Sequence, residues 1–203
     1  MQSWRMTVLE LWLMIPALAL AADPHAAHDP TSSVRPPSGE IKEFTHIDSL
    51  VDAGILNRNT DIVPVDKFVE RMYDVGSDEK GAKIFDVKKD RDFEVWNIGP
   101  EKKTIKGGTD LGPIIRENGS KIVEEAIKRL PKLATGEPNL NREILIYCGC
   151  CPAHSCPFVI GAVQVLKKRG LTNVKVINFE EELQSDWIDK GMPTQPRDLI
   201  MKK

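Results

Sequence analysis

Residues 144–157 have the sequence Ile-Leu-Ile-Tyr-Cys-Gly-Cys-Cys-Pro-Ala-His-Ser-Cys-Pro. The first four residues are an unbroken apolar run, which is typical of a strand buried on both faces of a parallel sheet. Pro157 suits the first turn of a helix, and the cations and glycine of Lys167-Lys-Arg-Gly170 predict where that helix ends. The loop between this strand and this helix contains all four cysteines of the chain.

Strand and helix patterns alternate on both sides of the cysteine loop. Before it, we predict strands at 61–65, 83–87 and 104–106, and helices at 66–72 and 120–130. Pro64 confines the first strand to a sheet edge, and Asp66 is expected to cap the first helix. After the loop, we predict a strand at 174–177 and a final helix or turn that contains Trp187 as a core residue. This alternation predicts an α/β fold, with a central, mostly parallel sheet and helices on both faces.

Composition limits the class of protein. The chain has 203 residues, of which 41% are hydrophobic and 29% are charged, and its formal net charge is −2. These values are typical of one soluble globular domain and exclude a polytopic membrane protein. Because basic residues are not in surplus, we expect neither a nucleic acid nor an anionic membrane as a partner.

The amino-terminal residues have the pattern of an export signal. The apolar run Leu11–Ala22 is shorter than the about 20 residues that span a bilayer, and it ends in small residues. We therefore predict a signal peptide at 1–22 and a periplasmic or secreted protein that is not held at the membrane after cleavage. Residues 23–45 are rich in Pro, Ser and His and are predicted to be a disordered linker. The folded domain is expected at 46–198.

The cysteine loop is the candidate site. In open α/β sheets, sites form beyond the carboxyl ends of the strands. The loop amides and the amino end of the following helix both favour an anion, so a thiolate there is expected to have a lowered pKa. A sulfur nucleophile in such a place is sufficient to carry a sulfur atom as a persulfide.

The order of these motifs resembles the rhodanese domain. Residues 144–148, Gly170-Leu-Thr-Asn-Val174 and Trp187-Ile-Asp-Lys-Gly-Met-Pro193 resemble its carboxyl-terminal half. Residues 84–87 and 105–108 resemble its amino-terminal half, with Lys88 and Thr104 in place of the usual Arg and His. The resemblance covers about residues 62–193, and the loop is similar to that of an exported bacterial subgroup with Cys-Gly-Cys-Cys-Pro. It implies a rhodanese-like fold.

The resemblance also implies an activity. A sulfurtransferase of this kind moves sulfane sulfur from thiosulfate or a persulfide donor to a thiol or cyanide acceptor, through a cysteine persulfide. The expected partners are therefore a small anionic sulfur donor and its acceptor. The reaction needs no cofactor, and the sequence does not identify a protein partner.

Catalytic candidates lie in the loop. The resemblance implies that Cys148 is the nucleophile, because it is the first loop residue. Cys151 is the alternative, since the five residues that follow it also suit a compact cradle. Cys156 lies at the helix N-cap and is a candidate resolving thiol. His154 is the only other ionisable side chain of the loop.

Substrate binding is expected from Gly149, Cys150 and Ser155 in the loop, and from Asp86 after an upstream strand. The chain also departs from the rhodanese pattern, because the loop lacks the usual Arg, the segment up to Gly170 is longer, and residues 178–181 replace a Gly-Gly. These departures leave alternatives open: a Cu(I) or Zn site formed by the cysteines, a thiol–disulfide redox module, a structural disulfide, or a non-catalytic rhodanese-like binding domain.

Overall fold

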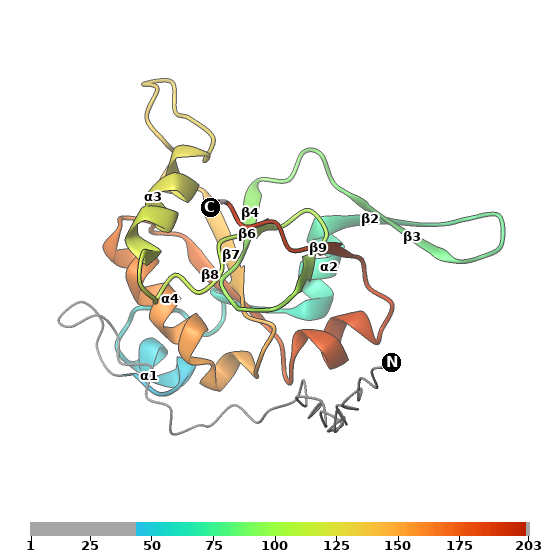
Figure 1. The fold of residues 1–203 in the computed structure, drawn as a ribbon, viewed down its shortest axis with the longest axis horizontal. Coiled ribbons are helices and arrows are strands. Elements are labelled where there is room, and N and C mark those ends of the chain that lie inside the picture. The colour runs from blue at the N-terminus through green and yellow to red at the C-terminus, as the bar shows by residue number, and fades with distance from the viewer. Residues whose placement is uncertain (1–43, 202–203) are drawn as a thin grey trace, which may run out of the picture. The chain divides into compact units, whose positions relative to one another are not determined.

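The computed structural model describes residues 44–201. Figure 1 shows the path of the chain through its helices and strands. In chain order they are α1 (Ile47–Asp52), β1 (Ile62–Pro64), α2 (Val65–Met72), β2 (Tyr73–Ser77), β3 (Lys83–Val87), β4 (Phe93–Asn97), β5 (Lys103–Ile105), β6 (Thr109–Asp110), α3 (Gly119–Lys128), β7 (Glu143–Tyr147), the 3-10 turn η1 (Ala153–Ser155), α4 (Pro157–Lys168), β8 (Val174–Asn178), the π-helical turn η2 (Gln184–Ile188) and β9 (Thr194–Pro196).

Five parallel strands form the central sheet, in the order β1-β8-β7-β4-β6. The predicted strand at 144–147 is β7, which lies in the middle and pairs with β4 and β8 on its two sides. The strand with Pro64 lies at the edge, as its missing amide hydrogen requires. The α/β fold with a central parallel sheet is therefore confirmed.

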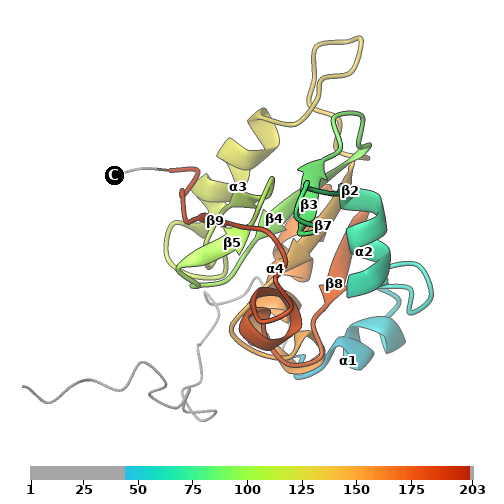
Figure 2. The ribbon, with the colours of Figure 1, turned by 90° about the vertical axis from the view of Figure 1, so that its right-hand side faces the viewer.

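Alternate residues of β7 face opposite sides of the sheet. Ile144 and Ile146 pack in a core with α1, α3 and α4, and Cys148 continues this side beyond the end of the strand. Leu145 and Tyr147 pack on the other side with α2 and η2. Figure 2 shows α3 and α2 on opposite sides of the sheet. Helices therefore cover both faces, and the side that receives the Cys148 thiol is settled by the period-two alternation of the strand.

Two smaller antiparallel sheets correct part of the strand prediction. The predicted strands at 83–87 and 104–106 exist as β3 and β5, but β3 pairs with β2 in a hairpin and β5 pairs with β9. The strand next to β7 in the parallel sheet is β4, which the sequence prediction missed. The apolar pattern of β3 resembles that of a buried strand, yet Ile84 is exposed on the hairpin. Alternation alone does not tell which sheet a short strand joins.

The predicted helices are present, with one correction at a helix start. Asp66 does not cap α2, because the chain turns directly from β1 into the helix at Val65 and leaves Pro64 at the N-cap. Trp187 is a core residue as predicted: it is fully buried, its ring packs 5.6 Å from that of Phe68, and its Nε1 donates to the Pro193 carbonyl (2.9 Å).

The predicted signal peptide at 1–22 lies outside the described residues, as does nearly all of the linker predicted at 23–45, so both stay predictions. Within residues 44–201, no helix combines the length and the apolar character needed to cross a membrane.

Candidate thiol site

The cysteine loop joins the carboxyl end of β7 to the first turn of α4 and is anchored on both sides. At its start, the Ile98 amide donates to the Tyr147 carbonyl (2.9 Å). The Leu183 amide donates to the Gly149 carbonyl (3.0 Å), and the Ala153 amide donates to a carbonyl just after β8 (2.9 Å). The loop is therefore held by segments far apart in the sequence.

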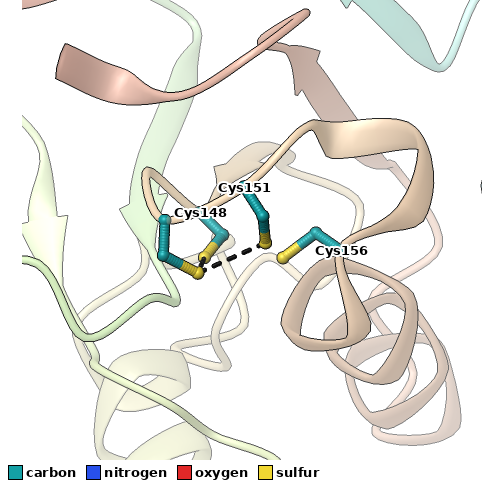
Figure 3. A group of neighbouring side chains, drawn as sticks. Cys148, Cys151 and Cys156 are labelled. Carbon is teal, nitrogen blue, oxygen red and sulfur yellow. Dashed lines mark hydrogen bonds between the residues drawn. The ribbon is translucent and has the colours of Figure 1, made fainter. Parts of the chain in front are cut away.

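Four thiols converge inside this loop. Their Sγ atoms all lie within 4.8 Å of one another. The Sγ of Cys150 lies 3.0 Å from that of Cys148 and 3.3 Å from that of Cys151. Both distances exceed the about 2.05 Å of a disulfide, and all four cysteines are free. Figure 3 shows the side chains of Cys148, Cys151 and Cys156 directed toward one another. Cys150 thus contacts both Cys148 and Cys151, and these three thiols are called the thiol row below.

The four thiols differ in exposure. Cys148 is 1% exposed and Cys156 is fully buried, whereas Cys150 and Cys151 are half-buried. Burial raises the pKa of the Cys148 thiol well above its ordinary value, and hydrogen bonds with the three other thiols raise it further. The expectation of a lowered pKa is therefore wrong for Cys148, because loss of hydration outweighs the attraction of loop and helix dipoles.

A carboxylate that the sequence prediction missed lies against Cys148. Oε1 of Glu101 accepts hydrogen bonds from the Gly149 amide (2.9 Å) and from the Cys148 thiol (3.4 Å). Its Oε2 is buried and accepts no hydrogen bond from the described residues. Burial raises the pKa of Glu101, while these hydrogen bonds and the charge of Arg197 oppose the rise. Glu101 follows the missed strand β4, so no signal in the sequence placed it at the loop.

A polar network holds the segment that carries Glu101. Nε of Arg197 donates to Oδ2 of the buried Asp110 (2.7 Å), and its Nη1 donates to the Pro100 carbonyl (2.8 Å). Nδ2 of Asn97 donates to Oδ1 of Asp110 (3.1 Å), and Oδ1 of Asn97 accepts from the Gly99 amide (3.0 Å). Arg197, which follows β9, thus holds residues 99–100 in place, and these residues position the Glu101 carboxylate.

Of the other predicted site residues, Gly149, His154 and Ser155 lie in the loop and Asp86 does not. Asp86 is exposed on the β2–β3 hairpin, where it pairs in register with Asp74. It lies in this hairpin and not in the parallel sheet, so its role in substrate binding stays a prediction. His154 is exposed on η1, and Ser155 beside it is half-buried. The Gly149 amide is already bonded to Glu101.

Two loop amides are available for an anion. The amides of Cys150 and Cys151 donate no hydrogen bond to any other described residue. Within residues 44–201, no lysine or arginine side chain forms a hydrogen bond or ion pair with the four cysteines. An anion bound here would therefore have these amide dipoles, and no side-chain cation, to offset the nearby Glu101 carboxylate.

The loop has no room for a methyl group at Gly149. A Cβ there would lie 2.5 Å from the Leu183 Cβ and 3.0 Å from the Glu101 Cγ. We expect Gly149→Ala to lower the free energy of unfolding by about 2 kcal/mol, since overpacking displaces backbone and side chains together. Urea unfolding measures this loss. The matched control is Gly76→Ala on the hairpin, where a Cβ meets nothing within 4 Å, and a loss equal to that of the control would contradict the close packing.

Comparison with protein-family models, with curated proteins and with solved structures gave no match.

Proposed function

We propose that this chain is a sulfurtransferase that carries sulfane sulfur on the thiol row. The observation that supports the proposal best is the position of Cys150, a free, half-buried thiol in contact with two others at 3.0 and 3.3 Å. The α/β fold places this loop where such folds form their sites, and a five-stranded parallel sheet between helices is compatible with a rhodanese-like domain.

Cys150 is the thiol that takes the sulfur in this proposal. Cys148 occupies the position that the rhodanese resemblance implies, but at 1% exposure a donor from solvent does not reach it first. The Cys150 thiolate attacks the outer sulfur of thiosulfate. The sulfur–sulfur bond of thiosulfate breaks, sulfite leaves with the electron pair, and the outer sulfur stays on Cys150 as a persulfide. In this proposal the amides of Cys150 and Cys151, which donate to no other residue within 44–201, hold the persulfide anion.

Thiosulfate tests the proposal directly. Reduced, metal-free full chain is mixed with thiosulfate without oxygen, and released sulfite is measured against time, with cyanide as the acceptor. We expect sulfite and thiocyanate in equal amounts, because cyanide takes the outer sulfur and returns the thiolate. If the reduced chain released sulfite no faster than a chain with all four thiols alkylated, thiosulfate would be excluded as the donor. Export to the periplasm or the medium remains part of the proposal.

A soft metal ion is a second candidate ligand of the same four thiols. Zn–S bonds of about 2.3 Å in a tetrahedron place sulfurs about 3.8 Å apart, and the four Sγ atoms within 4.8 Å come close to that set. Thiolates are the ligands that Cu(I) and Zn prefer, and the Glu101 carboxylate beside Cys148 adds negative charge that favours a cation.

Metal removal distinguishes this candidate. If the four cysteines hold a metal, the full chain purified without oxygen is expected to contain about one equivalent of Zn or Cu. The bound metal is expected to protect the thiols from alkylation. A chelator is expected to remove the metal and this protection together. Cys151→Ser is expected to lower the affinity at least about tenfold, since it removes one of four ligands. Metal content by mass spectrometry and thiol counts measure both effects. Full thiol reactivity in protein supplied with excess Zn would rule out this binding.

A further inference from the structure

We infer that sulfur loaded on the thiol row is released as sulfide by a neighbouring cysteine, so that the end product on the protein is a Cys148–Cys150 disulfide and the physiological acceptor is a dithiol reductant. This inference rests on the proposed function and identifies its acceptor. The juxtaposition that carries it is the 3.0 Å contact between the Sγ atoms of Cys148 and Cys150.

The contact is short enough for reaction. Groups held about 3–3.5 Å apart are at the distance from which attack begins, and a thiolate attacks one sulfur of a sulfur–sulfur bond to displace the other. A persulfide on Cys150 presents such a bond beside Cys148. A third thiol, Cys151, has its Sγ 3.3 Å from that of Cys150. An isolated persulfide cysteine has no such neighbour, so its sulfur waits for an acceptor from solution.

The step balances within the protein. The Sγ of Cys148 bonds to the Sγ of Cys150, the bond from Cys150 to the outer sulfur breaks, and that sulfur leaves as hydrosulfide with the Cys148 proton. The sulfane sulfur gains two electrons, and the two cysteines lose two as they become a disulfide. Together with the first step, thiosulfate and two thiols give sulfite, hydrogen sulfide and one disulfide. A small or protein dithiol then reduces the disulfide by exchange and restores both thiols.

The choice of Cys148 over Cys151 follows from ring geometry. Adjacent cysteines have Cα atoms about 3.8 Å apart, which is below the about 4.4 Å minimum of ordinary disulfides, so a Cys150–Cys151 bond is strained. Cys148 is separated from Cys150 by Gly149, which the Leu183 and Glu101 contacts hold in place. Cys148 is also buried, so it reacts with the persulfide on the neighbouring Cys150 and not with a donor from solvent.

The test uses reduced, metal-free full chain with thiosulfate and no added acceptor or reductant. We expect about one sulfite, about one sulfide and the loss of two thiols per chain, with differential alkylation assigning the disulfide to Cys148 and Cys150. Adding a dithiol such as dithiothreitol is expected to make sulfide release catalytic. Sulfite release with a stable persulfide and no sulfide would overturn the inference and leave the proposed function intact. Absence of sulfite would overturn both.

Variants separate the two steps. In Cys148→Ala/Cys151→Ala, we expect sulfite release to continue, sulfide release to fall at least tenfold, and a cyanide-removable persulfide to persist on Cys150. Continued sulfite release also shows that this variant is folded. The matched control is Ser77→Ala on the β2–β3 hairpin, which leaves all four thiols in place and is expected to release sulfide like the parent chain. Equal sulfide release from the double variant and the parent would overturn the inference.

Discussion

Cys150→Ser is expected to lower sulfite release from thiosulfate by about 10³-fold or more. The substitution keeps the shape of the side chain but replaces the sulfur that contacts both other thiols of the thiol row with a hydroxyl, a far weaker nucleophile at neutral pH. The initial rate of sulfite release with cyanide present measures the effect. No other substitution in this loop is expected to reduce the first step as much.

The matched control for this result is Ser77→Ala on the β2–β3 hairpin. It changes an exposed side chain and leaves the contacts of Cys150 with Cys148 and Cys151 in place. We expect it to keep the parent rate within a few-fold. If Cys150→Ser kept the parent rate and Cys148→Ala lost it, sulfur transfer would stand. The acceptor would then be Cys148, as the rhodanese resemblance implies, and Cys150 would be only its neighbour.

Arg197→Met is expected to lower the free energy of unfolding by about 3–5 kcal/mol near neutral pH. The guanidinium is the charged partner of Asp110, whose side chain is only 1% exposed, and it also donates to the carbonyls of Gly99 and Pro100. Removing one partner of a buried ion pair leaves the other charge without compensation. Urea unfolding of parent and variant measures the loss.

The loss is expected to depend on pH. Burial raises the pKa of Asp110 above its ordinary 3.8, and Arg197 opposes that rise. Without Arg197 the pKa of Asp110 rises further, so the folded variant binds a proton more readily than the unfolded chain. Its stability relative to the parent therefore falls as the pH rises through the pKa of Asp110 and is restored in part at acid pH.

The control for this prediction is Asp110→Asn/Arg197→Met, which removes both charges. We expect it to recover at least about half of the loss near neutral pH, because no buried carboxylate remains. A loss of less than about 1 kcal/mol in the single variant, or an equal loss at about pH 4 and about pH 7, would show that the pair is hydrated like a surface ion pair.

Long periodic segments were predictable from the sequence. The apolar run at 144–147 became the middle strand, and the segment from Pro157 to Lys168 became α4. Both patterns follow from burial. A strand covered on both faces is a continuous apolar run, whereas a helix that packs on a sheet has apolar residues at helical spacing. The short strands at 83–87 and 104–106 were placed in the wrong sheet, because a run of three to five residues carries no information about its partner strand.

Part of the candidate site was likewise predictable from the sequence, and part was not. Four cysteines between a buried strand and a helix start already marked the loop in the sequence as the place for sulfur chemistry, because the ends of parallel strands and the starts of helices bring such groups to one edge of a sheet. Only the tertiary structure showed which thiols touch, which are buried, and that Glu101 lies against Cys148. The contact with Glu101 joins residues 47 positions apart in the sequence. The loss of water at this point raises the pKa of Cys148, where the local dipoles alone would lower it.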